Sequence, residues 1–153
     1  MEKSIARMIT LLSRKCQCYF SRELPKFGIT AAEQPFFMAL QRCEGITQEE
    51  LTAVVCVDKS ATARAVRSLE QKGFLIRVQD KNNRRQNRIY PTEKARQLGP
   101  VVKKELLHFN AMMIQGIPPE TAELIYAALE KMEENFEEIL GNKMSPDKQK
   151  KTQ

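Results

Sequence analysis

Residues 58–92 read DKSATARAVRSLEQKGFLIRVQDKNNRRQNRIYPT, and they contain the clearest structural pattern in the chain. In its first part, residues 60–72, apolar side chains recur at helical spacing on one side and cationic or polar side chains occupy the other, which predicts an amphipathic helix. Gly73 follows, and glycine commonly ends helices because it adopts positive φ. Two strand-forming runs, 74–78 and 87–90, flank a loop of Asp, Asn, Lys and Arg residues, which is typical of a hairpin. We therefore predict a helix followed by a two-stranded ribbon with a basic tip.

Positive charge is concentrated in this part of the chain. Of the 25 Lys and Arg residues, 11 lie between residues 59 and 96, together with only 3 of the 19 Asp and Glu residues. This segment carries a net charge of +8, and because the whole chain carries +6, the remainder carries −2. Such a field recruits a polyanion and steers it to one face of the molecule. A run of charge is usually a solvated surface, but the helix and ribbon around it favour a binding face.

Size and composition are those of a soluble globular domain. The chain of 153 residues is about one domain long and can bury a core without disulfides. Its hydrophobic share of 42% and charged share of 29% fit this class. Charged residues interrupt every apolar run well short of a membrane span, and an Arg interrupts the N-terminal apolar region. We therefore expect no membrane partner, no export signal and a cytoplasmic location.

The region before the central stretch predicts two helices. Residues 4–24 carry one apolar stripe, and Pro25 is expected to end that helix. Residues 30–33, Thr-Ala-Ala-Glu, form a capping box that opens a second helix, because the Thr hydroxyl and the Glu carboxylate satisfy each other's backbone donors. Pro35 is expected to bend this helix slightly.

A short third helix precedes the basic helix. Residues 47–50, Thr-Gln-Glu-Glu, repeat the capping-box pattern and predict a helix that reaches residue 55. The link before it, residues 44–46, can add an edge strand to the ribbon. Asp58 can cap the basic helix. A short helix, a tight turn and a basic helix together have helix-turn-helix spacing.

The region after the ribbon predicts two more helices. Thr92 can cap a long helix, in which Gly99 and Pro100 predict a kink or a short break. The last helix, residues 120–140, has an apolar seam, and between residues 120 and 138 it carries seven Glu and one Lys. Nucleic acid would repel this acidic helix, so it should lie away from the bound polyanion. The long stripes of the terminal helices suggest mutual packing and dimerisation.

Several short motifs in the central region resemble the MarR family of bacterial transcription regulators, which are dimeric winged-helix proteins. They match the recognition helix and wing of that family in order and spacing, and the resemblance covers the helix order of nearly the whole chain. The matching motifs are Asp58-Lys59-Ser60, Leu69-Glu70-Gln71-Lys72-Gly73-Phe74-Leu75, and Asp80 with Arg84-Arg85 followed by Thr92-Glu93-Lys94.

The resemblance implies a mainly α fold with a small β wing, an α+β winged helix-turn-helix. Residues 29–99 would form the DNA-binding domain, and residues 1–28 and 100–142 a helical dimerisation region. The remaining residues, 143–153, are polar and basic without periodicity, and we expect a disordered tail there.

The resemblance also implies how the chain would contact double-stranded DNA. The helix at residues 60–72 would enter the major groove, where Arg contacts guanine edges bidentately. The loop at residues 81–88 would reach the backbone or the adjacent minor groove. Ser60, Arg64 and Arg67 are expected to contact the groove, and Thr47, Gln48 and Lys59 the phosphates. Expected contacts from the wing are Lys81, Asn82, Arg84, Arg85 and Arg88.

Asp80 is similar to a wing Asp that shapes the loop in this family by pairing with a nearby Arg. Arg84 is therefore either a structural partner of Asp80 or a DNA contact, and both interpretations stay open. The sequence departs from the family at Asn82, where Arg is frequent, at Asn83, where Asp is common, and at Arg67, where an acid is common. These departures leave the sequence preference open.

The function that the resemblance implies is a homodimeric, sequence-specific transcription regulator on a pseudo-palindromic operator, with half-sites about one helical turn apart. It would be a repressor relieved by a small aromatic or phenolic effector. Tyr19, Phe36 and Phe37 could line the effector pocket, although plain core packing is the alternative. One branch of the family senses oxidants through a Cys in its first helix, where Cys16 lies; its supporting tyrosine hydroxyls are missing from the second helix here.

Two other classes of function, an enzyme and a protein-interaction module, are the alternatives to a DNA-binding regulator. The chain has no Gly-rich phosphate loop, no set of nucleophile, base and orienting group, and no metal-ligand cluster, so we expect no catalytic residue, cofactor or metal ion. His108 has only Glu105 at helical spacing as a possible second ligand. The four cysteines lack metal-site spacing. A winged helix can also serve as a protein-interaction module, but outward arginines favour DNA.

Overall fold

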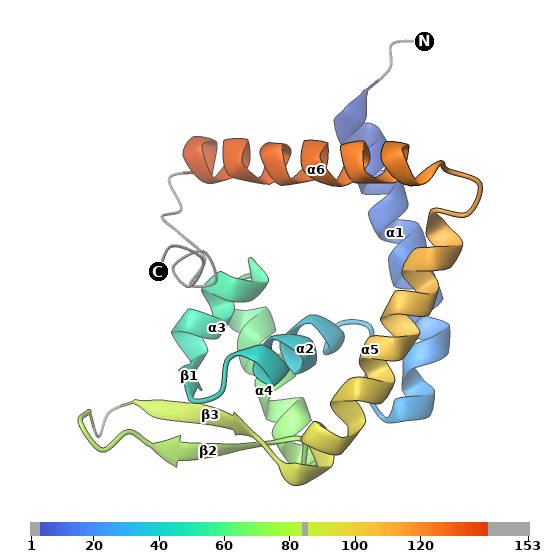
Figure 1. The fold of residues 1–153 in the computed structure, drawn as a ribbon. Helices are drawn as coiled ribbons and strands as arrows, with labels where there is room; N and C mark the ends of the chain where they lie inside the picture. The colour runs from blue at the N-terminus through green and yellow to red at the C-terminus, as the bar shows by residue number, and fades with distance from the viewer. Residues whose placement is uncertain (1–3, 84–85, 141–153) are drawn as a thin grey trace. The chain divides into compact units, whose positions relative to one another are not determined.

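The computed structural model describes residues 4–83 and 86–140. Figure 1 shows a mainly helical chain with a small antiparallel sheet, as predicted. The elements in chain order are α1 (Ile5–Glu23), the 3-10 helix η1 (Leu24–Phe27), α2 (Gln34–Arg42), β1 (Ile46–Thr47), α3 (Gln48–Val55), α4 (Lys59–Gln71), β2 (Leu75–Gln79), β3 (Asn87–Pro91), α5 (Glu93–Met113) and α6 (Pro119–Leu140). The chain divides into two compact units, Met1–Lys103 and Lys104–Gln153. Arg84, Arg85 and the predicted tail at 143–153 lie outside the described residues.

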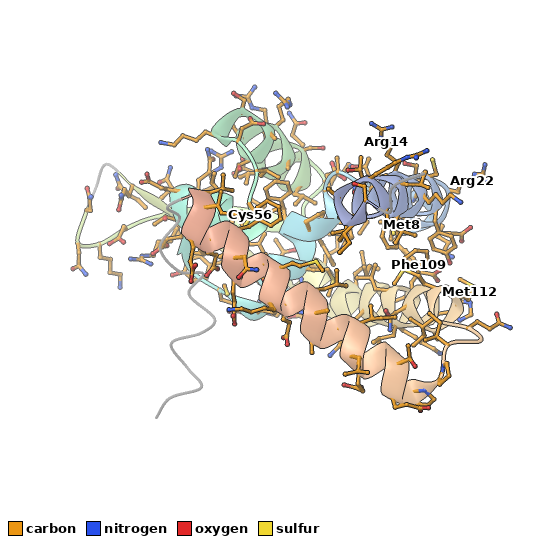
Figure 2. The ribbon with its side chains drawn as sticks, turned by 90° about the horizontal axis from the view of Figure 1, so that it is seen from above. Met8, Arg14, Arg22, Cys56, Phe109 and Met112 are labelled. Atoms are coloured by element: carbon orange, nitrogen blue, oxygen red, sulfur yellow. The ribbon has the colours of Figure 1, made fainter. Side chains whose placement is uncertain are left out.

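Local capping explains where α3 and α4 begin. Thr47 is the N-cap of α3, and its hydroxyl accepts a bond from the Glu50 backbone N–H while the Glu50 carboxylate accepts one from the Thr47 backbone N–H, as a capping box requires. Asp58 caps α4 by accepting a bond of 2.8 Å from the backbone N–H of Ala61. Between the two helices, Cys56, labelled in Figure 2, adopts a positive φ of 55°. The predicted short helix, turn and longer helix are confirmed.

The sheet has the strand order β1-β3-β2, and both pairings are antiparallel. Ile46 and Thr47 pair with β3, which confirms that the link before α3 adds an edge strand. Side chains alternate between the faces of the ribbon, so Leu75 and Ile89 are buried whereas Ile76 and Val78 are exposed. One face of the ribbon therefore packs against the helices.

The core of the first unit combines side chains from the helices and the strands. Burying each large apolar side chain contributes about 1.5–3 kcal/mol, so this cluster holds the helix-turn-helix and the ribbon together. Side chains with 2% or less of their surface exposed include Leu24, Ile29, Phe37, Leu40, Leu51, Val66, Leu69, Leu75, Ile89 and Val102. Phe37 meets the edge of Phe74, with 5.5 Å between the ring centroids.

Two expectations about proline need correction. α2 begins at Gln34, so Pro35 lies in its first turn rather than past it and has no helix to bend. Proline is tolerated there because the N–H that it lacks has no partner in the first turn. The expected capping-box bonds between Thr30 and Glu33 do form, in the turn just before α2.

α5 continues through Gly99 and Pro100, so of the expected kink or short break the break is wrong, and the kink stays a prediction. Proline removes only one intrahelical hydrogen bond, and the rest of the helix remains intact. Gly99 is buried against α2: a Cβ atom there would lie 2.5 Å from Oε1 of Gln41. Close packing of α5 on Gln41 therefore explains the glycine.

The terminal helices carry exposed apolar stripes. On α1, Ile5 is 60% exposed and Met8, labelled in Figure 2, is 55% exposed. On α6, in the second unit, Leu129 is 47% exposed and Phe136 is 57% exposed.

Candidate nucleic-acid interface

One side of α4 is cationic and exposed. Ser60, Arg64, Arg67 and Gln71 are all exposed and recur at intervals of three or four residues, which places them on one face of the helix. The opposite face is buried and consists of Thr62, Ala65, Val66 and Leu69. The residues predicted to contact the groove therefore share one outward surface. The opposite, apolar face of α4 packs into the core, so this surface points to solvent.

Hydrogen bonds join α4 to α3 inside the helix-turn-helix. Thr62 is fully buried, and its hydroxyl accepts a bond of 3.0 Å from the Thr52 hydroxyl and donates one of 3.1 Å to the carbonyl oxygen of Asp58. Buried hydroxyl groups are stable only with such partners. The bond from Thr52 holds the first turn of α4 against α3, and the bond to Asp58 lies within that turn.

Two ion pairs hold the C-terminal half of α4, and the first joins Lys72 to Glu33. Lys72 donates to both carboxylate oxygens of Glu33, at 2.9 and 2.7 Å, and Ser68 Oγ also donates to this carboxylate. Glu33 is 4% exposed. Burial raises the pKa of Glu33, but the bonds from Lys72, Ser68 and the Thr30 backbone N–H together lower it by more. The net effect is a pKa below the usual value of 4.5.

On the other flank of α4, Glu70 Oε2 lies 3.2 Å from Nε of Arg77 on β2. Arg77 also lines a polar hollow of about 340 Å³ between the start of α3, the start of α4 and the ribbon. The hollow is lined by Thr47, Gln48, Glu49, Thr52, Lys59, Arg77, Gln86, Asn87 and Ile89. It therefore brings together all three predicted phosphate partners and adds Arg77, which sequence reasoning assigned only to a strand. The sequence does hold a sign of this role: Arg77 is a cation on the same face of the strand as the buried Leu75.

Two of the three predicted phosphate partners have side chains free to turn outward. Lys59 is exposed and its Nζ lies 3.8 Å from Oε1 of Glu49, which is too long for a firm bond between exposed groups. Gln48 is half-buried at the first position of α3. Thr47 is different, because its hydroxyl both donates to and accepts from Glu50. The pKa of Glu50 is lowered, first by the bond from the Thr47 backbone N–H.

Asp80 organises the wing loop. Its Oδ1 accepts bonds from the backbone N–H groups of Asn82, at 2.8 Å, and Asn83, at 3.3 Å, and its Oδ2 accepts one from Nε of Arg88. These bonds lower the pKa of Asp80, the bond from Asn82 first and then that from Arg88. Asp80 is 7% exposed, so the carboxylate forms the interior of the loop.

The partner of Asp80 among the described residues is Arg88, whereas sequence reasoning considered Arg84. In the hairpin register Gln79 pairs with Asn87 and Val78 with Arg88, which brings the Arg88 side chain to Asp80 across the ribbon. Arg88 Nη1 also donates a bond of 2.7 Å to the carbonyl oxygen of Gly45. Arg88 therefore has a structural role, and its predicted DNA contact would use what remains of its guanidinium group. Lys81 and Asn82 are exposed at the loop.

The aromatic residues suggested for an effector pocket pack mainly in the core. Phe36 is 3% exposed and Phe37 1% exposed. Tyr19 is half-buried, with its ring edge-on to Phe20 at 5.7 Å between centroids. A second, more apolar hollow of about 380 Å³ lies elsewhere and is lined by Lys26, Phe27, Phe74, Lys94, Gln97, Leu98 and Val101. A pocket formed by Tyr19, Phe36 and Phe37 stays a prediction.

The thiols give no sign of a paired site within the described residues. Cys16, the predicted redox candidate, is half-buried and free, and so is Cys43, whereas Cys18 and Cys56 are exposed and free. No group of three or more His, Cys, Asp or Glu side chains in residues 4–83 and 86–140 is arranged to hold a metal ion. In the same residues, no helix combines the length and the apolar character needed to cross a bilayer.

A capped short helix, a recognition helix with an outward cationic face and an antiparallel wing define a winged helix-turn-helix. Residues 37–86 match the model of the MarR family. A MarR transcriptional regulator from Methanosarcina mazei Go1 is 33% identical and has a similar structure, with a TM-score of 0.84 over 88% of this chain and 97% of that one. The chain belongs to the MarR family, as its sequence motifs suggested, and it is a transcription regulator of the DNA-binding winged-helix class.

Two further relatives have the same character. A MarR family regulator from Listeria monocytogenes, solved in complex with a 26mer DNA, is 28% identical with a TM-score of 0.82, over 94% of this chain and 99% of that one. The uncharacterized HTH-type transcriptional regulator YybA of Bacillus subtilis (strain 168) is 28% identical over 133 residues, which are 87% of this chain and 89% of the relative. These relatives are regulators rather than enzymes.

Proposed function

We propose that this chain is a homodimeric, sequence-specific regulator that binds a pseudo-palindromic operator in double-stranded DNA and represses transcription. The observation that carries the proposal is the outward face of α4, where Ser60, Arg64 and Arg67 are exposed together while the other face is buried. A helix of 13 residues is about 20 Å long and about 10 Å wide with its side chains, which fits the major groove.

In the proposed complex, Arg64 and Arg67 contact base edges. Arginine donates two parallel bonds to O6 and N7 of guanine, and each good pair of this kind contributes about 1–3 kcal/mol of discrimination. Ser60, in the first turn, is close enough to the helix N-terminus to donate to a base edge or a phosphate. The recognition helix would therefore supply specificity.

Phosphate contacts would come from both sides of α4. Lys59 and Gln48 lie together at the polar hollow beside the start of α3. Thr47 has its hydroxyl bound in the capping box, so its contribution would be to present the N-terminus of α3, where backbone N–H groups attract an anion. On the wing, Lys81 and Asn82 are exposed around the Asp80 turn. These contacts position the protein and make binding depend on salt.

The homodimer is supported by the exposed apolar stripes on the terminal helices. Residues 1–28 and 100–142 would form the dimerisation region and residues 29–99 the DNA-binding domain. Exposed fractions of 60% for Ile5, 47% for Leu129 and 57% for Phe136 are high for large apolar side chains in a monomer. The acidic side of α6 suits a position away from DNA. A two-fold dimer presents two recognition helices to half-sites about one helical turn apart, and the 26mer bound by the Listeria relative is long enough for such a pair.

We also propose that a small aromatic or phenolic effector relieves repression, as the family resemblance implies. Such a ligand needs a concave, largely apolar site with a few polar groups. The candidate lining is Tyr19 on α1 with Phe36 and Phe37 on α2, and because both Phe side chains are buried, a cavity would have to open beside them to admit the ligand. Binding of the ligand must favour a conformation that binds DNA less tightly, because a ligand with equal affinity for both states shifts nothing.

The experiment is a selection from a random double-stranded library, followed by gel shifts with the selected duplex and a scrambled one over a salt series. We expect one enriched pseudo-palindrome, a steep fall of affinity with salt, and a dimer by light scattering. Substituting both Arg64 and Arg67 with Ala should abolish the preference for the selected duplex. Equal affinity of the native protein for both duplexes would refute sequence-specific regulation.

A further inference from the structure

Polar contacts hold the last two turns of α4 on two opposite flanks. Ser68 and Lys72 donate to Glu33, which lies in the turn just before α2. Glu70 pairs with Arg77 on β2 at 3.2 Å. Residues 68 and 70 are two positions apart, which is about 200° around an α-helix. The recognition helix is therefore braced on one side by a carboxylate of the preceding turn and on the other by a guanidinium of the wing.

Glu33 is the more strongly held of these two braces. Its side chain is 6% exposed, whereas those of Glu70 and Arg77 are 40% and 32% exposed. Exposed pairs contribute little because solvent screens them, whereas solvent screens the interaction of a buried charge with its partners less. The Glu33 carboxylate accepts bonds from Ser68 Oγ, Lys72 Nζ and the Thr30 backbone N–H, so its lone pairs are well satisfied.

Rotation of α4 about its own axis decides where its arginines point. The buried face consists of Thr62, whose hydroxyl is bonded to Thr52 near the start of α4, and of Ala65, Val66 and Leu69, whose apolar contacts have no preferred direction. Hydrogen bonds do have one, so the braces fix a rotation that the apolar face leaves adjustable. A rotation of about 10° moves a side-chain tip about 6 Å from the helix axis by about 1 Å. That displacement is enough to spoil a bidentate contact with a base edge.

We propose that Glu33 is a positioning residue for DNA recognition: it fixes the rotation of α4 and thereby directs Arg64 and Arg67 at the base edges. Glu33 itself does not touch DNA, because it is buried and anionic. It also holds the Thr30 backbone N–H, so it couples the recognition helix to the turn between η1 and α2. The inference rests on the proposed sequence-specific binding of DNA.

The test is the isosteric change Glu33→Gln, compared on the duplex selected by the native protein and on a scrambled duplex. The change removes one negative charge, so electrostatics alone would tighten binding to any DNA. A positioning role predicts the opposite for the selected duplex. The measured ratio is the dissociation constant for the scrambled duplex divided by that for the selected duplex. We expect this ratio to fall about tenfold, since one bidentate contact discriminates by about that factor or more. A loss of folded protein weakens both complexes equally and cancels in this ratio.

The matched control is Glu44→Gln. It makes the same change of charge in a carboxylate that is paired with Arg96 at the surface. We expect this variant to keep the native ratio. If Glu33→Gln does not fold, Ser68→Ala removes one of the bonds to Glu33 and should lower the ratio less, by about threefold, a typical value for one hydrogen bond.

The outcomes separate the inference from the function on which it rests. If the native protein prefers no duplex, sequence-specific binding fails before any variant is made, and the inference fails with it. If the native protein does prefer one, an unchanged ratio in the Glu33 variant, or in the Ser68 variant where the first does not fold, overturns the positioning role. An equal loss on both duplexes also overturns it, because that result describes stability alone.

Discussion

Arg88 reaches across the wing ribbon to Asp80: its Nε donates to the Asp80 carboxylate, and its Nη1 donates to the carbonyl oxygen of Gly45 at 2.7 Å. One side chain thus joins the turn of the wing to the link before α3. Because Asp80 also accepts two backbone bonds from the loop, the shape of the wing depends on this carboxylate. The relationship fixes the described base of the wing, on both sides of residues 84 and 85.

Asp80→Asn should weaken binding to every duplex. The amide keeps one oxygen for the loop N–H groups but turns an NH₂ group toward Arg88, so the loop loses its ion pair and becomes less ordered. We expect a loss of roughly tenfold in affinity that is similar for selected and scrambled DNA, because the wing contributes backbone contacts. Gel shifts measure the affinity, and faster hydrogen exchange at the amides of Asn82 and Asn83 reports the loop. Slow exchange at these amides in the variant would contradict the structural role.

Arg64→Ala should remove discrimination at particular base pairs of the operator. If Arg64 contacts a guanine bidentately, the change costs about 1–3 kcal/mol on the selected duplex and little on a scrambled one. A panel of duplexes with single base-pair changes identifies the position that no longer matters. Gln71→Ala, on the same exposed face but in the last turn, provides the comparison. A uniform loss over the whole panel would assign Arg64 to the phosphates instead.

Arg85→Ala should weaken binding to all sequences and flatten its dependence on salt. Each phosphate contact releases about one counterion, so the slope of log Kd against log salt concentration should decrease in magnitude by about 1. Binding is measured from about 50 to 200 mM salt with both duplexes. The slope of the native protein retained in the variant would rule out a phosphate contact by this side chain.

The buried carboxylate of Glu33 makes stability depend on pH in the acid range. Its pKa is lowered below 4.5 in the folded protein, so its contribution is fully present above about pH 4.5 and is lost as the pH falls through the folded value. Glu33→Gln lacks this group, and the difference in unfolding free energy between native and variant protein should therefore shrink below pH 4.5. Urea unfolding between about pH 3.5 and 7 measures it. A constant difference over this range would show that Glu33 carries no such linkage.

Leu129→Glu should convert the proposed dimer to a monomer. The change puts a charge into the apolar stripe of α6, and a buried unpaired charge costs several kcal/mol. Light scattering measures the mass, and the salt series shows whether affinity for the two-half-site duplex is lost with it. Glu130→Gln, at the next position along the same helix and also exposed, should remain a dimer. A dimeric Leu129 variant with native affinity would place the dimer contact elsewhere.

The local elements of this protein could be predicted from short-range patterns in its sequence. Thr47 with Glu50 and Asp58 with Ala61 interact over three residues, and the apolar period of α4 repeats every turn, so short-range patterns suffice to predict helices α3 and α4 and the turn between them. Turn residues and two strand-forming runs predicted the ribbon in the same way. The outward arginines of α4 followed from this period, whereas the class of regulator followed from the resemblance of the motifs to the MarR family.

Only the tertiary structure decided which distant residues meet. Glu33 and Lys72 are 39 positions apart, and Arg88 and Gly45 are 43 positions apart, so no local sequence pattern predicts these contacts. The hairpin register chose Arg88 for Asp80, where the sequence left Arg84 open, and packing against Gln41 explains Gly99 in an unbroken α5. Phe36 and Phe37 are also buried in the core, because apolar surface is buried by whichever elements meet it in space. Residues 58–92 contain the basic helix and the wing, and the fold brings in the distant side chains that hold them in place.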